Sequence, residues 1–249
     1  MTTSEITTAR FDFGRVFRQT FTVIGAKLPI LLLLGFVLLW PAAIANGIAV
    51  ARIYSRHLGY FEQLGAIQVL ALGVTLFSAL ANTIAAPVVT DALNISSPMR
   101  GRPLQALARY GLPAIIVQVI VQLATALGTL ALFVPGLLVM VIWYTAIPSL
   151  IFDGTGIGGA LNRARVLSRG HRWSIFGITF LLGLISLAPY VMLLPLTGGL
   201  HPSGPSADLL IAGRSAVVGL TGCIHMVAVT VVYWELRRLK EGGLADVFD

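Results

Sequence analysis

The chain has 249 residues, of which 57% are hydrophobic and 11% are charged, and its formal net charge is +7. This composition leaves too few polar residues to cover the surface of a soluble domain, so it excludes an ordinary soluble globular protein. The positive charge is not accompanied by a basic and aromatic surface pattern, so we do not expect nucleic-acid binding.

Six apolar runs of about 20 residues dominate the chain, and this length crosses a bilayer core about 30 Å thick. They predict an all-α fold in which residues 1–249 form one integral membrane domain. Pro41 is expected to kink the first span, and residues 134–136 to form a tight hairpin between the third and fourth spans. The predicted spans cover about residues 28–49, 64–90, 112–133, 136–152, 174–196 and 211–234.

Two further segments have the periodicity of amphipathic helices that lie in the headgroup region of a membrane. In residues 11–27 the face of this helix is formed by Phe13, Val16, Phe17, Thr20, Phe21 and Ile24. In residues 156–170 the apolar face is formed by Ile157, Ala160, Leu161, Ala164 and Leu167. Residues 101–113 show a weaker form of the same amphipathic pattern. The chain is therefore compatible with a three-fold internal repeat, in which each unit is an interfacial helix followed by two spans.

Basic residues are distributed unequally between the two sides of the predicted spans. Of the 17 Lys and Arg residues, only Arg52, Arg56 and Arg214 fall on the side opposite the termini. The positive-inside rule therefore predicts that both termini are cytoplasmic. Arginines that flank the interfacial helices are expected to contact the headgroups of anionic lipids: Arg15, Arg18, Arg163, Arg165, Arg169 and Arg172.

Polar residues recur at helical spacing within the apolar spans. Two interpretations are open: the polar side chains pack helices together, or they line a polar cavity between spans two, three and six. The candidate cavity residues are Gln68, Thr75, Asn82, Gln118, Gln122, Thr125 and His225. Span six also has a face of small residues that allows close helix packing, namely Ala212, Ser215, Ala216, Gly219, Gly222 and Cys223.

Catalytic chemistry is not indicated by the residues within the spans. They contain no Asp or Glu, and His225 has no evident acid, nucleophile or metal partner. The single cysteine, Cys223, forms no pair with metal-ligand spacing. We therefore expect no enzyme activity, no metal and no cofactor.

The second half of the chain carries a family pattern. It consists of Pro135, Gly136, Trp143, Pro148, Asp153, Ala160, Arg163, Leu167, Arg169, Gly170, Trp173 and Phe176, followed by "YWELRRLKEGG" at residues 233–243. This pattern resembles the glycerophosphoryl diester phosphodiesterase membrane-domain family and related uncharacterised bacterial six-helix inner-membrane proteins. The resemblance implies the fold and a bacterial inner-membrane location. It does not imply phosphodiesterase activity, which belongs to a separate barrel domain in that family.

Three functions fit these observations. The first is a non-catalytic inner-membrane protein that organises lipids or partner proteins through its basic interfacial helices, acting alone or as a homo-oligomer. The second is a transporter or permease component, which requires a polar cavity that reaches the middle of the membrane. The third is the membrane subunit of an enzyme that acts with a soluble partner. The sequence favours the first.

Overall fold

A computed structural model describes residues 11–54, 59–193, 195 and 207–242. Within this part the chain is helical, and six segments are long and apolar enough to cross a membrane. The predicted all-α, multi-pass fold is therefore confirmed. The helices are α1 Phe13–Leu34, the π-helix η1 Gly35–Leu39, α2 Trp40–Tyr54, α3 Tyr60–Ala92, α4 Pro103–Ala131, α5 Phe133–Ile142, α6 Ala146–Asp153, α7 Gly156–Ser168, α8 Arg172–Leu193, α9 Ala207–Arg237 and the π-helix η3 Arg238–Gly242.

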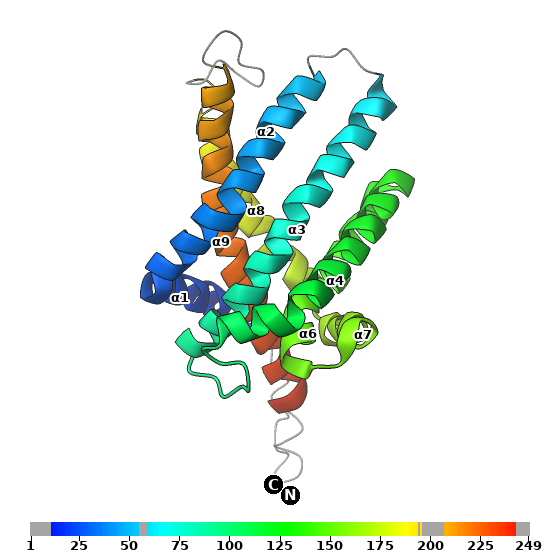
Figure 1. The fold of residues 1–249 in the computed structure, drawn as a ribbon. Coiled ribbons are helices and arrows are strands. Elements are labelled where there is room, and N and C mark those ends of the chain that lie inside the picture. The colour runs from blue at the N-terminus through cyan, green and yellow to red at the C-terminus, as the bar shows by residue number, and fades with distance from the viewer. Residues whose placement is uncertain (1–10, 55–58, 194, 196–206, 243–249) are drawn as a thin grey trace, which may run out of the picture.

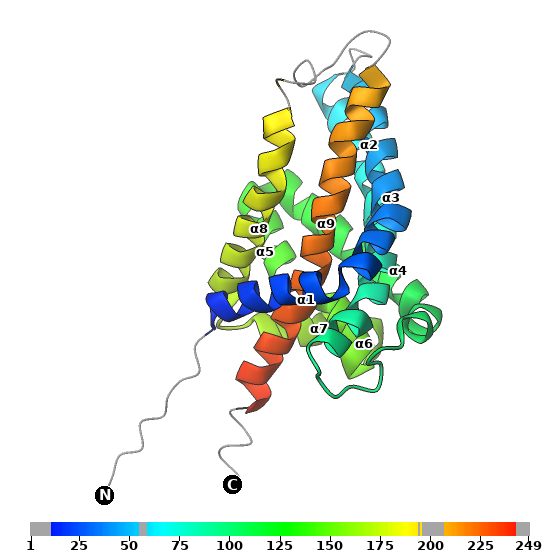
Figure 2. The ribbon, with the colours of Figure 1, turned by 90° about the vertical axis from the view of Figure 1, so that its left-hand side faces the viewer.

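The first helix changes direction where the predicted interfacial segment meets the first span. Asp12 caps α1, since its carboxylate accepts a hydrogen bond from the Arg15 amide at 2.9 Å. The helix then runs across the end of the bundle (Figure 2) and bends at Lys27, whose φ and ψ are −121° and 21°. Pro29 follows in the first turn of the spanning part, where its missing N–H costs little. The bend lies against α3, because Lys27 Nζ is 3.1 Å from Asp91.

The expected kink at Pro41 takes the form of a local widening of the first span. Pro41 has no N–H, and its ring would clash with the carbonyl of Val37 in a regular α-helix. The five residues of η1, which ends at Leu39, adopt π-helical geometry. Only Trp40 lies between η1 and Pro41. A π-bulge provides the extra room within a continuous helix.

The fourth span is broken, although the sequence predicts one continuous run at 136–152. Residues 143–145 form a turn between α5 and α6. Pro148 accounts for the position of the break, because its ring is incompatible with a helical residue four positions earlier, at Tyr144. The connection between the third and fourth spans also differs from the prediction. Only Leu132 separates α4 from α5, and residues 134–136 lie in the first turn of α5.

The bundle is packed more tightly at one end than at the other. We call the tight end the basic end; it carries both ends of the described chain (Figure 1) and includes Lys27, Arg100, Arg163 and Arg237. Among the described side chains, α3 is buried only from Ala79 onwards and α4 only up to Val117. In both helices the buried residues therefore lie in the half towards the basic end.

The second predicted interfacial helix is present as α7, but its apolar face contacts protein. Ala160, Ala164 and Leu167 are fully buried, and Ile157 and Leu161 pack beside α6. The sequence suggested instead that this face borders the acyl chains. Periodicity locates an apolar face but does not distinguish a lipid neighbour from a protein neighbour.

Candidate functional site

A cavity of about 440 Å³ lies halfway along the spans. Six segments of the chain contribute to it: the first span, α3, α4, the region of the α5–α6 break, α8 and α9. Its position follows from the packing described above. It lies where α3 and α4 pass from the buried basic end to the less packed half of the bundle, and where the fourth span loses its helical geometry.

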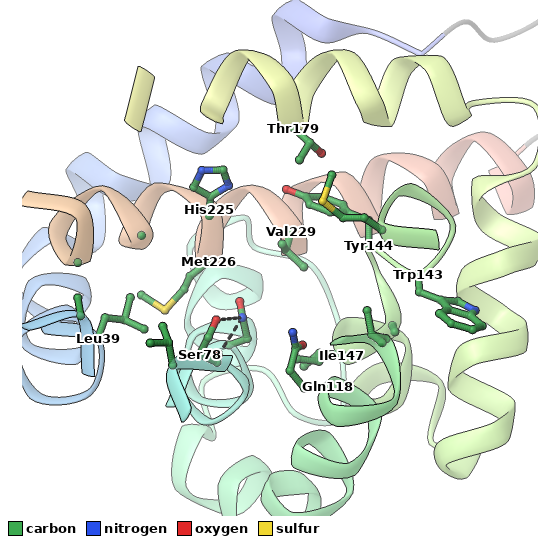
Figure 3. Close-up of a pocket in the computed structure, with 18 residues that line it drawn as sticks. Leu39, Ser78, Gln118, Trp143, Tyr144, Ile147, Thr179, His225, Met226 and Val229 are labelled. Atoms are coloured by element: carbon green, nitrogen blue, oxygen red, sulfur yellow. Dashed lines mark hydrogen bonds between the residues drawn. The ribbon is translucent and has the colours of Figure 1, made fainter. Parts of the chain in front are cut away.

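The cavity has polar groups on two sides (Figure 3). Tyr144, Thr179 and His225 lie together, with the Tyr144 hydroxyl directed towards His225 and Thr179. Ser78, Asn82 and Gln118 approach from α3 and α4. The remaining lining is apolar and includes two methionines and a tryptophan: Leu39, Ala43, Val74, Val121, Met140, Trp143, Ala146, Ile147, Gly219, Gly222, Met226 and Val229.

Two of the residues that line the cavity, Asn82 and Gln118, have side-chain amides. Asn82 donates to the Ser78 carbonyl at 2.9 Å and to its hydroxyl at 3.3 Å. Its own side-chain oxygen is buried without a partner in the described part of the chain. Gln118 points its amide into the cavity from α4 (Figure 3), and no described residue forms a hydrogen bond with that amide. The unpaired Asn82 oxygen is costly in an apolar interior, and the Gln118 amide is only partly buried, so it is open to a ligand or to water.

Of the seven predicted cavity residues, the structure brings three together: Asn82, Gln118 and His225. Thr75 lies on α3 outside the lining, and its hydroxyl bonds to the Leu72 carbonyl at 2.8 Å. Gln122 and Thr125 are also outside the lining, and the side chain of Gln68 falls outside the described residues.

The outer part of α4, which carries Thr125, packs against α5. This agrees with the interpretation that polar residues at helical spacing pack helices together. The backbone at Thr125 and Thr129 lies against α5, where a Cβ on Gly136 would lie 3.0 Å from the Thr125 carbonyl and 2.8 Å from the Thr129 nitrogen. Tyr144 and Thr179 were not singled out in the sequence. Tyr144 reaches the cavity because the fourth span breaks beside it, and no periodicity signals that break.

His225 is held by a neighbour, and no described residue completes a catalytic group with it. Its Nε2 is 3.2 Å from the Ser186 hydroxyl of α8. Within the described residues, no three His, Cys, Asp or Glu side chains are placed to hold a metal ion. The described lining offers hydrogen-bonding groups and apolar side chains.

A second polar cluster closes the basic end, and we call it the Asp153 cluster. Asp153 forms ion pairs with Arg163 of α7 at 3.4 Å and Arg237 of α9 at 3.5 Å, and accepts a hydrogen bond from Tyr233 at 3.1 Å. Glu241 bridges the same two arginines. The cluster thus joins α6, α7 and α9.

The six arginines predicted to contact lipid have different surroundings. Arg163 belongs to the Asp153 cluster, and Arg15 lies 3.9 Å from Asp12. Arg172 is half-buried. Only three of the six are exposed at the surface of the basic end, namely Arg18, Arg165 and Arg169.

Comparisons with known proteins find no matching family model, no similar curated protein and no similar solved structure.

Proposed function

We propose that the protein is a transporter or permease component of the bacterial plasma membrane, with both termini cytoplasmic. One observation carries the proposal: a partly polar cavity lies halfway along the spans, next to a broken helix. Broken helices around a site at the bilayer midplane are a recurrent feature of secondary transporters. The sequence alone favoured a lipid organiser, and the geometry of the cavity supports this alternative better.

The direction of access follows from packing and charge. The basic end is buried and cross-linked by ion pairs, whereas α3 and α4 have no buried described side chains beyond the cavity. The positive-inside rule places the basic end in the cytoplasm. In this conformation the cavity is entered from the outer side.

Cysteine accessibility tests this proposal without knowledge of the solute. In a Cys223→Ala background, Ser78→Cys places a thiol in the cavity, and Val69→Cys places one on the outer surface of α3, where the native side chain is 67% exposed. A charged, membrane-impermeant thiol reagent added to intact cells should modify Ser78→Cys. It should spare Val69→Cys, because an exposed side chain within a span is expected to border the acyl chains. A cysteine at Ser78 that stays unmodified would contradict the proposal.

A second function, the organisation of anionic lipids, is favoured by a different surface. Exposed arginines and exposed large apolar residues occur together at the basic end, including Trp173 at 84% exposure and Leu104 at 76%. Such mixed surfaces lie well in the headgroup region. Changing Arg18, Arg165 and Arg169 together to Gln should reduce the anionic lipid that co-purifies with the protein, measured by lipid mass spectrometry. An unchanged lipid profile would argue against this second function.

A further inference from the structure

We propose that the cavity selects an uncharged ligand that carries an amide or hydroxyl group on an apolar body. This ligand class rests on the proposed function, in which the ligand is the transported solute. It specifies which molecule binds in the cavity, whereas the proposed function concerns how the molecule reaches it. Three features of the cavity carry it: the absence of charge, the hydrogen-bonding groups left open and the apolar remainder of the lining.

Charge is absent from the lining. No Asp, Glu, Lys or Arg is among the described residues that border the cavity. The ion pairs of Asp91 and Asp153 lie at the basic end, outside the lining, and their members are already paired with one another. A carboxylate or an ammonium group would therefore enter a low-dielectric site without a counter-ion, which is costly halfway across a membrane.

The open hydrogen-bonding groups specify the polar part of the ligand. Gln118 offers both an acceptor and a donor to the cavity, and Asn82, which also lines it, has a buried side-chain oxygen that no described residue uses. A carboxamide complements this set, since it has a donor N–H group and an acceptor carbonyl. A hydroxyl group can also donate to one amide while accepting from the other. A site built to hydrogen-bond such a group rejects analogues that lack it, because its own amides then stay unpaired.

The rest of the lining specifies the apolar body. Met140 and Met226 are flexible thioethers that adapt to irregular shapes, and Trp143 adds an aromatic surface. The volume of about 440 Å³ falls within the range of small-molecule sites, about 300–1,000 Å³. A bicyclic aromatic body with one polar substituent is therefore a suitable probe.

Three probes of the same shape and different charge test the inference: naphthalene-2-carboxamide, 2-naphthoate and 2-naphthamidinium. Each is titrated calorimetrically into the full chain in lipid nanodiscs, and empty nanodiscs provide the partition background. The carboxamide should bind saturably, and each charged probe at least tenfold more weakly. Equal binding of either charged probe, or no saturable binding of the carboxamide, would overturn the inference.

Matched variants separate the cavity from the rest of the protein. Gln118→Leu removes an amide that bonds to no described residue, so this variant should fold normally and bind the carboxamide about tenfold more weakly. Asn82→Leu should have a similar effect. Thr75 lies on α3, as Asn82 does, but outside the cavity. The Thr75→Val variant should therefore bind the carboxamide as tightly as the wild type. Carboxamide binding that is unaffected by either leucine variant would also overturn the inference.

The two proposals fail in different ways. If Ser78→Cys cannot be modified from outside but the carboxamide binds, the proposed function is wrong and the ligand class stands. If Ser78→Cys is modified but no carboxamide binds, the ligand class is wrong and the transport proposal stands.

Discussion

Asp153 connects three helices through one side chain that is only 11% exposed. It lies at the end of the eight-residue helix α6, and its partners come from α7 and α9. Removing the charge of Asp153 leaves the partly buried Arg163 and Arg237 with Glu241 alone as their acidic partner among the described residues. The contribution of this residue should therefore be much larger than that of a surface ion pair.

Asp153→Asn should lower the free energy of unfolding by about 2 kcal/mol. Asp208→Asn is the control, because Asp208 pairs with Arg52 at 3.4 Å with both side chains more than 60% exposed, and such pairs contribute about 0–1 kcal/mol. Thermal unfolding in detergent, followed by tryptophan fluorescence, compares the two variants. Equal melting temperatures would show that the Asp153 cluster does not hold the basic end together.

His171 gives the basic end a dependence on pH. It lies in the turn between α7 and α8, where burial and the charge of Lys240 lower its pKa below 6.5. In the unfolded chain the histidine takes up a proton first as the pH falls. The stability linked to this residue is therefore complete above about pH 6.5 and decreases below it.

Between pH 7.5 and pH 5.5, the wild type should accordingly lose more thermal stability than His171→Gln, measured by the same unfolding assay. Identical pH profiles for the two proteins would contradict the account of His171.

At the scale of the helices, α4 and α5 approach each other through two glycines. A Cβ on Gly128 would lie 2.9 Å from the Gly136 nitrogen, and a Cβ on Gly136 would lie 2.8 Å from the Thr129 nitrogen. Both contacts are with backbone, which cannot move aside as a side chain can. The single residue between these helices, Leu132, requires this close approach.

Gly136→Ala should therefore destabilise the protein by about 1–3 kcal/mol through overpacking. Gly73→Ala in α3 is the matched control, because a Cβ there meets nothing within 4 Å, and alanine favours a helix over glycine. Melting temperatures of the two variants provide the comparison. A Gly136→Ala protein as stable as the Gly73→Ala protein would rule out the close α4–α5 contact.

Hydropathy predicts the presence of six spans, because the bilayer fixes their length and composition, and six described segments are long and apolar enough to cross a membrane. It does not predict the break at residues 143–145, since Trp143, Tyr144 and Thr145 interrupt an apolar run only briefly. Pro148 contains the signal, but a proline in a span is compatible with a kink as well as with a break.

The candidate site is predictable only in part, because helical spacing identifies a polar face but not what lies against it. Helical spacing identifies Asn82 and Gln118 as members of polar faces, and the structure directs both into one cavity. Spacing does not show which helix each face meets, so it also selects Thr125, which lies outside the cavity. The Asp153 cluster joins residues about 80 positions apart in the sequence, and periodicity within one helix carries no signal of such a contact.

At the scale of the whole molecule, the buried residues of α3 and α4 lie at the basic end, and the cavity lies where their burial ends. Ion pairs of Asp153 and Asp91 fasten the basic end, and close contacts between small residues of α9 and the first span hold these two helices together. In α3 and α4, the described side chains beyond the cavity are not buried within the protein. Access to the cavity should therefore differ strongly between the two sides of the membrane.

The direct test is the rate at which Ser78→Cys, in the Cys223→Ala background, reacts with the impermeant thiol reagent in right-side-out and in inverted membrane vesicles. The account predicts modification at least tenfold faster in right-side-out vesicles, where the reagent meets the face opposite the basic end. Equal rates, or faster modification in inverted vesicles, would contradict it.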